Sequence, residues 1–139
     1  QFAEYEMLTN RMSEEGESLN ADNLSKLYLE LNKKYYGDEI VSDDEIAYEW
    51  ARIPHFYYNF YVYQYATSYC AAYSVAHKIL EEGAPAVERY KKFLSSGCSQ
   101  APVELLKIAG VNLETPAPIQ DALDAFGKII DEMTVLVEA

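Results

Sequence analysis

Several features that mark other classes of protein are scarce in this 139-residue chain. Basic residues are outnumbered, because 11 Lys and Arg stand against 23 Asp and Glu, for a net charge of −12. Such a field repels a phosphate backbone, so we expect no nucleic-acid partner. No apolar run approaches the roughly 20 residues that a membrane-spanning helix needs, and no signal peptide is visible, so we expect no membrane partner.

Cysteine and histidine are equally sparse. Cys70 and Cys98 in an acidic chain without a secretion signal fit a reducing compartment, which predicts a cytoplasmic protein. The histidines are His55 and His77, and neither an HExxH nor a CxxC motif is present, which argues against a complete zinc site within the chain. Cys70 and His77 would share a helix face, but about 10 Å apart along the axis, too far for a thiolate–imidazole pair.

Strand signals are missing too, since no Asn-Gly or Asp-Gly turn lies between alternating runs. Apolar residues instead recur at helical spacing, which predicts an all-α helical bundle forming a single domain over residues 1–139. Gly and Pro residues punctuate the pattern and set the expected helix ends. The expected helices cover residues 2–14, 20–36, 44–52, 56–82, a segment starting near Pro85, 102–109 and 118–137.

Tyrosine is abundant. The chain has 13 tyrosines, and seven of them lie between Tyr57 and Tyr73. A buried phenol needs a hydrogen-bond partner, so this density of tyrosine is unusual for a hydrophobic core. It is typical of a surface that binds a peptide or another chain. His55 follows Pro54 at the mouth of the expected long helix, where it can point into a cleft. The residues alone leave a second interpretation open, in which His55 caps a helix and the tyrosines pack with their hydroxyls at the surface.

The segment from Arg52 to Thr67, RIPHFYYNFYVYQYAT, resembles a hallmark of the oligoendopeptidase F family. That family belongs to the zinc oligopeptidases, together with thimet oligopeptidase and dipeptidyl carboxypeptidase. Ser68 stands where the family often has Gly, and it is still small enough for close helix packing. The resemblance extends over essentially the whole chain, through residues 2–6, 35–37, 50–51, 90–97 and 102–112.

The resemblance implies more than this chain contains. The family's HExxH and its third ligand, a downstream Glu, would both lie before residue 1. The chain is therefore expected to be the C-terminal fragment of a larger helical zinc peptidase catalytic domain, with the missing N-terminal portion of the same polypeptide as its partner. Zinc is expected in the full-length enzyme and none on this chain, which should be inactive alone.

The resemblance also assigns residues. In such enzymes zinc activates a water and polarises the scissile carbonyl of an oligopeptide, and donors in the C-terminal part stabilise the resulting oxyanion. The family's His matches His55, and its Tyr aligns best with Tyr63, with Tyr58 as a second candidate. Tyr57 and Tyr61 are the expected substrate-binding residues on the channel wall.

An alternative from a different class remains. The chain would then be a standalone helical peptide-binding or protein-interaction domain that uses its tyrosine-rich helix as the binding surface. A piece cut from a larger helical enzyme would instead leave an apolar surface uncovered, which predicts a homo-oligomer with the segment from Tyr57 to Tyr73 near the contact.

Overall fold

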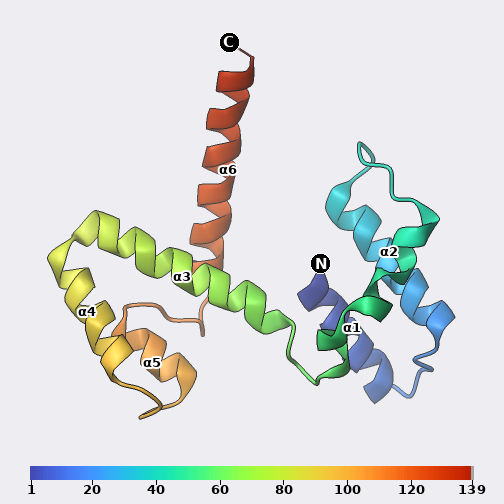
Figure 1. Cartoon of the computed structure of the whole chain (residues 1–139), viewed down its shortest axis with the longest axis horizontal. Coiled ribbons are helices and arrows are strands. Elements are labelled where there is room, and N and C mark those ends of the chain that lie inside the picture. Colours follow the sequence, from blue (N-terminus) through green and yellow to red (C-terminus); the bar gives the residue numbers. More distant parts are fainter. Residues whose placement is uncertain (139) are drawn as a thin grey trace. The chain divides into compact units, whose positions relative to one another are not determined.

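The structure is a computed structural model that describes residues 1–138, and every regular element in that range is a helix (Figure 1). The predicted all-α class is confirmed. Contacts divide the chain into two compact units, residues 1–66 and the part that begins at Thr67. Each unit has its own hydrophobic cluster.

The first unit combines two α-helices with two 3-10 segments and leads into the start of α3. Asn20 caps α2 by accepting from the Asn23 N–H at 2.9 Å, and Asp43 caps η1 by accepting from the Ile46 N–H at 2.9 Å. These caps satisfy backbone donors that the first helical turn leaves free. The elements are α1 (Phe2–Glu14), α2 (Ala21–Tyr36), η1 (Asp44–Arg52) and η2 (Pro54–Tyr57).

Aromatic side chains form the core of the first unit. Tyr5 and Tyr28 are fully buried, with ring centroids 5.2 Å apart in an edge-to-face arrangement. The Tyr28 hydroxyl donates to Glu49 Oε2 at 2.6 Å, and the Trp50 indole N–H donates to Ser25 Oγ at 3.1 Å. Large aromatic rings therefore fill this core while their polar atoms keep partners, as burial requires.

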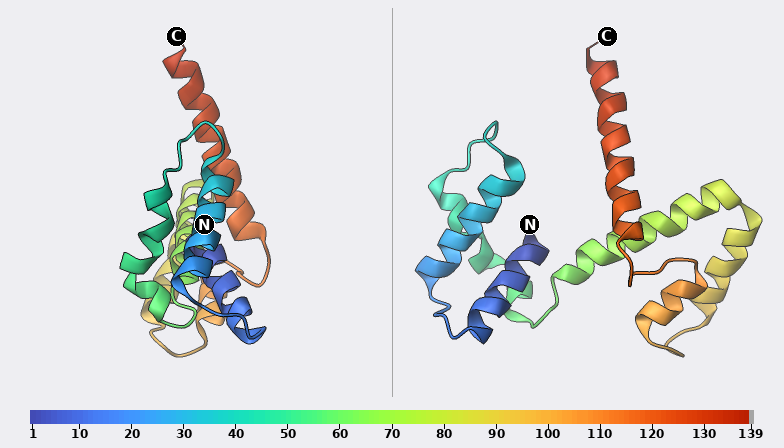
Figure 2. Two further views of the ribbon diagram at one scale, coloured as in Figure 1. Left: turned by 90° about the vertical axis from the view of Figure 1, so that its right-hand side faces the viewer. Right: turned by 180° about the vertical axis from the view of Figure 1, so that it is seen from behind.

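The second unit is more regular, and its core is made of smaller side chains. Ala71 and Val75 on α3 pack against Ala109 and Val111. The α4 and α5 helices contact each other, whereas α6 projects away from that pair (Figures 1 and 2). The elements are α3 (Tyr63–Glu82), α4 (Ala84–Ser95), α5 (Pro102–Ile108) and α6 (Ala117–Val137). These bounds lie within a residue or so of the predicted ones for the last three helices.

The predicted continuous helix over 56–82 is wrong in its first part. Pro54 opens a 3-10 turn that ends at Tyr57, and α3 begins only at Tyr63. Between them Phe60 has a φ of 51°, in the left-handed region that an α-helix of L-residues cannot continue through. The short helix predicted over 44–52 is present with those bounds, as a 3-10 helix.

The α6 helix carries a long apolar surface that the described residues leave exposed. Its side chains include Phe126 at 62% and Met133 at 58% exposure, and the exposure continues to the end of the helix. Within residues 1–138, none of the helices is both long enough and apolar enough to cross a bilayer. The exposed apolar side chains of α6 are Ile119, Leu123, Phe126, Ile129, Ile130, Met133, Val135, Leu136 and Val137.

Candidate functional site: an aromatic cluster around His55

His55 is placed by a short, anchored turn. Pro54 occupies the first turn of η2, where its fixed φ suits a helix start. The next residue, Phe56, packs edge-on against Tyr5 at 4.9 Å and against Phe2 at 5.6 Å between ring centroids. Because Phe56 is held in the core of the first unit, the neighbouring half-buried His55 has a defined position.

Two tyrosine rings contact the imidazole, and a third contacts one of them. Tyr61 stacks on His55 with centroids 5.4 Å apart and an interplanar angle of 16°, and Tyr65 meets it edge-on at 5.6 Å. Tyr58 contacts Tyr61 at 5.9 Å, and Tyr61 contacts Tyr65 at 5.9 Å. We call these four residues the His55 cluster. The three tyrosines are 41% to 59% exposed and His55 is partly buried, so the cluster forms a surface and not a core.

The phenols of this cluster are suited to donating a hydrogen bond. A side-chain hydrogen bond with Tyr61 raises the pKa of Tyr65 above its ordinary value, and partial desolvation adds to the effect. The ordinary tyrosine pKa is about 10, so Tyr65 stays protonated at neutral pH. A neutral phenol that keeps its proton can donate to an oxygen that gains negative charge.

The other two tyrosines singled out from the sequence lie differently. The Tyr63 side chain lines a separate hollow of about 400 Å³ with Met7, Arg11 and other residues of α1 and the loop before α3. The Tyr57 hydroxyl donates to the Ala51 carbonyl at 3.2 Å. Ring contacts therefore join His55 to Tyr61 and, through Tyr61, to Tyr58.

Tyr65 was missed from the sequence. Its signal was available, because Tyr61 and Tyr65 are four residues apart and such pairs face each other across one helical turn. Within the expected helix over 56–82 this spacing pairs the two tyrosines, but it does not place either of them beside His55, and in the structure Tyr61 lies before α3 begins.

A second missed residue is Glu6, a carboxylate buried to 3% exposure. It accepts three consecutive backbone N–H groups, from Tyr61 at 2.7 Å, Val62 at 2.8 Å and Tyr63 at 2.9 Å. These donors sit at the start of α3, where helix N–H groups lack intrahelical partners. The signal was its position: Glu6 follows Phe2 by four residues and so lies on the apolar face of α1.

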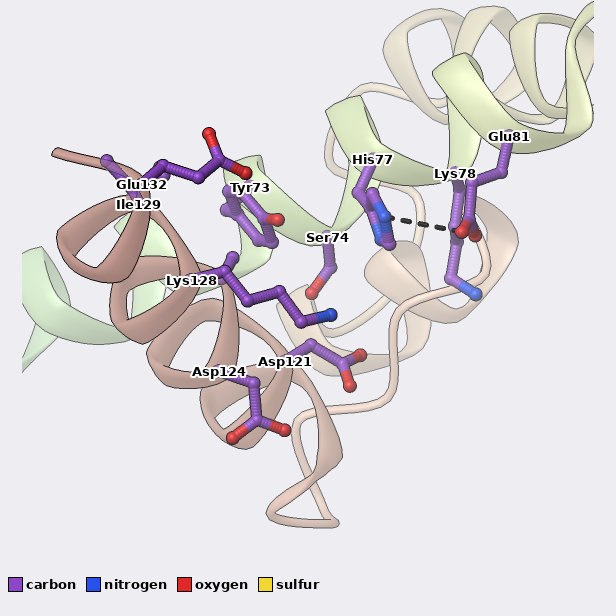
Figure 3. A pocket seen from close by; sticks show the side chains of 11 residues that line it. Tyr73, Ser74, His77, Lys78, Glu81, Asp121, Asp124, Lys128, Ile129 and Glu132 are labelled. Carbon is purple, nitrogen blue, oxygen red and sulfur yellow. Dashed lines mark ion pairs between the residues drawn. The ribbon is translucent and has the colours of Figure 1, made fainter. Parts of the chain in front are cut away.

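A second hollow lies in the second unit, between α3 and α6 (Figure 3). It has a volume of about 460 Å³ and is lined by four carboxylates and two lysines as well as His77. His77 Nε2 lies 3.3 Å from Glu81 Oε1, and both side chains are largely exposed. At the base of the hollow the Ser74 hydroxyl lies 3.5 Å from the Pro118 carbonyl oxygen. Charges of both signs around an open hollow select no single ligand.

The residues present do not fit a zinc centre. Within residues 1–138, no three His, Cys, Asp or Glu side chains gather closely enough to hold a metal ion. Cys70 and Cys98 are free thiols.

Comparisons with known proteins agree on one family. Residues 1–125 match the model of peptidase family M3. The chain is 52% identical over 136 residues to oligopeptidase PepF of Bacillus subtilis, covering 98% of this chain and 20% of that protein. It is 43% identical over 138 residues to the chromosomal oligoendopeptidase F of Lactococcus lactis subsp. cremoris, covering 99% of this chain and 23% of that protein.

A solved structure matches as well. The crystal structure of oligoendopeptidase-F from Enterococcus faecium superimposes with a TM-score of 0.89 at 43% sequence identity. The match covers 98% of this chain and 26% of that one. The chain thus spans about a fifth to a quarter of the length of the relatives it matches.

Proposed function

Because the chain belongs to peptidase family M3, we propose that it forms the C-terminal part of a zinc-dependent oligoendopeptidase that hydrolyses oligopeptides. The observation that supports this most is the His55 cluster. It places an imidazole and phenols together on one partly exposed surface, where a peptide carbonyl can reach them.

In this proposal the chain supplies the donors for the transition state. Attack on a peptide carbonyl places negative charge on its oxygen, and preorganised donors stabilise that charge far more than the neutral ground state. His55 and Tyr65 are the proposed donors, because their rings are in contact and the phenol keeps its proton. Tyr58 and Tyr63 are the alternative phenols, and Tyr61 and Tyr57 would line the peptide path.

The metal belongs to another part of the enzyme under this proposal. Zinc, when bound, would polarise the scissile carbonyl and activate a water. In this proposal the zinc ligands come from residues outside this chain. The role of this chain is to orient the substrate and to donate hydrogen bonds.

The remaining polypeptide would also cover exposed surface. Apolar patches larger than a few hundred Å² tend to be covered by a partner, and α6 carries such a surface along its length. In this proposal the partner is the N-terminal portion of the same polypeptide. Both units of this chain then belong to one catalytic domain, and the enzyme is cytoplasmic. A second copy of the chain is the competing cover when the fragment is alone.

The test compares single hydroxyl deletions in the complete enzyme. Tyr65→Phe should lower kcat about 10²- to 10³-fold with little change in KM, because the lost hydrogen bond forms only in the transition state. Tyr63→Phe and Tyr58→Phe decide between the alternative donors. Tyr69→Phe, on an exposed tyrosine of α3, is the matched control and should cleave a quenched fluorescent oligopeptide at the wild-type rate.

Zinc content, measured by atomic absorption, should stay at the wild-type level in every variant. A complete enzyme that cleaves no oligopeptide, or three Tyr→Phe variants with full kcat, would contradict this assignment.

A standalone peptide-binding domain is the second candidate, and the exposed tyrosine rings favour it. It predicts that the 139-residue chain alone binds oligopeptides in isothermal titration calorimetry and that Tyr61→Ala abolishes the binding. The peptidase proposal predicts weak or no binding by the isolated chain.

A further inference from the structure

We propose that Glu6 is a positioning residue of this site: its buried carboxylate holds the backbone of residues 61–63 so that the His55 cluster keeps one arrangement. The inference rests on the proposed peptidase function for its kinetic consequence. Its structural content, a carboxylate from α1 that caps α3, can be tested separately.

The Glu6 side chain uses both of its carboxylate oxygens to accept three consecutive backbone N–H groups. Glu6 Oε1 accepts from the Tyr61 and Val62 N–H groups, and Oε2 accepts from the Tyr63 N–H, at 2.7 to 2.9 Å. Hydrogen bonds to an ionised acceptor are shorter and stronger than neutral ones. Since Glu6 is 3% exposed, water cannot easily replace it at these donors.

A carboxylate suits this place for two reasons. The start of α3 carries the positive end of the helix dipole, which favours an anion. Successive N–H groups near a left-handed residue also form a concavity that binds anions, and Phe60, with φ 51°, immediately precedes the three donors. The carboxylate therefore stabilises a backbone conformation that is otherwise unfavourable for a non-glycine residue.

The held segment leads directly into the cluster. Tyr61, one of the three donors, stacks on His55, and the Tyr65 N–H donates to the Val62 carbonyl at 3.1 Å, which links Tyr65 to the same turn. His55 itself is held from the other side by Phe56 in the core. Loss of the Glu6 contact should therefore move Tyr61 and Tyr65 relative to an unmoved His55.

A merely structural role makes a different prediction. If Glu6 only stabilised the fold, its replacement would lower the free energy of unfolding but leave the geometry of the folded site unchanged. The kcat measured well below the unfolding temperature would then be unaffected. A positioning role changes kcat in the folded enzyme, and its effect overlaps with that of removing the phenol it positions.

The experiment uses the complete enzyme with Glu6→Gln, Tyr65→Phe and the double variant. A Gln side chain offers one acceptor oxygen, so it cannot serve all three donors. Glu4→Gln is the matched control: it removes the same charge two residues away on the same helix, where the carboxylate contacts Lys34 and Tyr35. Glu6→Asp keeps the charge on a shorter side chain and tests rescue if Glu6→Gln does not fold.

Two measurements test the structural claim and the kinetic claim separately. Hydrogen exchange of the peptide covering residues 58–65 should be faster in Glu6→Gln and unchanged in Glu4→Gln, whether or not the enzyme cleaves peptides. In kinetics, Glu6→Gln should lower kcat about 10- to 100-fold with KM within a few-fold, because small displacements of reacting groups are costly. Glu6→Asp should give a smaller loss.

The double variant should be less impaired than the product of the two single losses, because both changes disturb the same donor. Wild-type exchange of residues 58–65 in Glu6→Gln would overturn the structural claim. Faster exchange with unchanged kcat, or with losses that multiply fully, would overturn the positioning role while leaving the proposed peptidase function in place. An inactive wild-type enzyme would instead count against the proposed function.

Discussion

The two units of this chain each contain a histidine stacked on a tyrosine, and the two pairs arise in different ways. His77 stacks on Tyr73 with centroids 5.7 Å apart and an interplanar angle of 18°, and His55 stacks on Tyr61 at 5.4 Å and 16°. The first pair is four residues apart within one regular helix. The second is joined across a 3-10 turn and a left-handed residue, and Glu6 from another helix holds its backbone.

This difference shows why similar ring pairs need not have similar roles. A stack that helix spacing creates is a local consequence of sequence and occurs wherever two rings are four residues apart. A stack that depends on irregular backbone persists only where the surrounding structure holds it, and such segments are frequent at functional sites. The His55 cluster is of the second kind.

The hydrophobic cores of the two units also differ. The first unit buries large aromatics whose polar atoms have partners, such as the Tyr28–Glu49 hydrogen bond. The second unit packs Ala and Val between regular helices and leaves the apolar side chains of α6 exposed. The first unit therefore holds an irregular loop in place, whereas the second leaves an apolar helix face exposed.

The largest effect should come from emptying the aromatic core. Tyr5→Ala should lower the free energy of unfolding of the first unit by about 3 to 5 kcal/mol, as for other aromatic truncations in cores. Val111→Ala, at a fully buried site of the second unit, should cost roughly 2 kcal/mol. Urea denaturation followed by hydrogen exchange of peptides from each unit measures both. Equal losses would contradict the contrast between the two cores.

The two histidines give the sharpest comparison of function. In the complete enzyme His55→Ala should reduce kcat about 10²- to 10³-fold, equivalent to about 3 to 4 kcal/mol, if His55 donates to the oxyanion. His77→Ala removes an equally stacked ring from an exposed helix face and should leave kcat unchanged. Steady-state cleavage of an oligopeptide with a zinc assay checks both. Loss of zinc in His55→Ala would assign His55 to the metal site instead.

Alkaline pH should weaken the first unit. Burial raises the pKa of Tyr5, and burial together with the Glu49 hydrogen bond raises that of Tyr28. A group with a raised folded pKa stabilises fully below its unfolded pKa, about 10 for tyrosine, and this stability is lost as pH rises towards the folded value. Thermal unfolding should thus show a steep decline above pH 10, and Tyr28→Phe should make it shallower. An unchanged pH profile in Tyr28→Phe would argue against this.

The smallest effect on stability should come from α6. Ile130→Glu with Met133→Glu places charge on its exposed apolar face and should change the unfolding free energy by no more than about 0.5 kcal/mol. The same change should reduce self-association of the 139-residue chain at high concentration, measured by light scattering. Leu80→Glu, at an exposed position of α3 outside the segment from Tyr57 to Tyr73, serves as the control. A wild-type chain that stays monomeric would leave α6 without a role in association.

The sequence by itself determined the helical class and most helix ends. Helical spacing of apolar residues and the Gly and Pro residues between helices are local signals, and the helix expected over 20–36 does end before Gly37. The resemblance of the segment from Arg52 to Thr67 pointed to the family, which the comparisons support. Local signals suffice there because backbone hydrogen bonding within a helix involves residues close in sequence.

Tertiary structure decided the start of α3 and the membership of the site. The sequence around residue 60 does not predict a left-handed residue, because Phe rarely adopts that conformation unless other parts of the structure stabilise it. The support comes from Glu6, more than 50 residues earlier in the chain. That distant carboxylate ends the irregular loop, turns Tyr61 and Tyr65 towards His55 and leaves Tyr63 beside α1, so the partners of His55 follow from packing between helices and not from spacing along the chain.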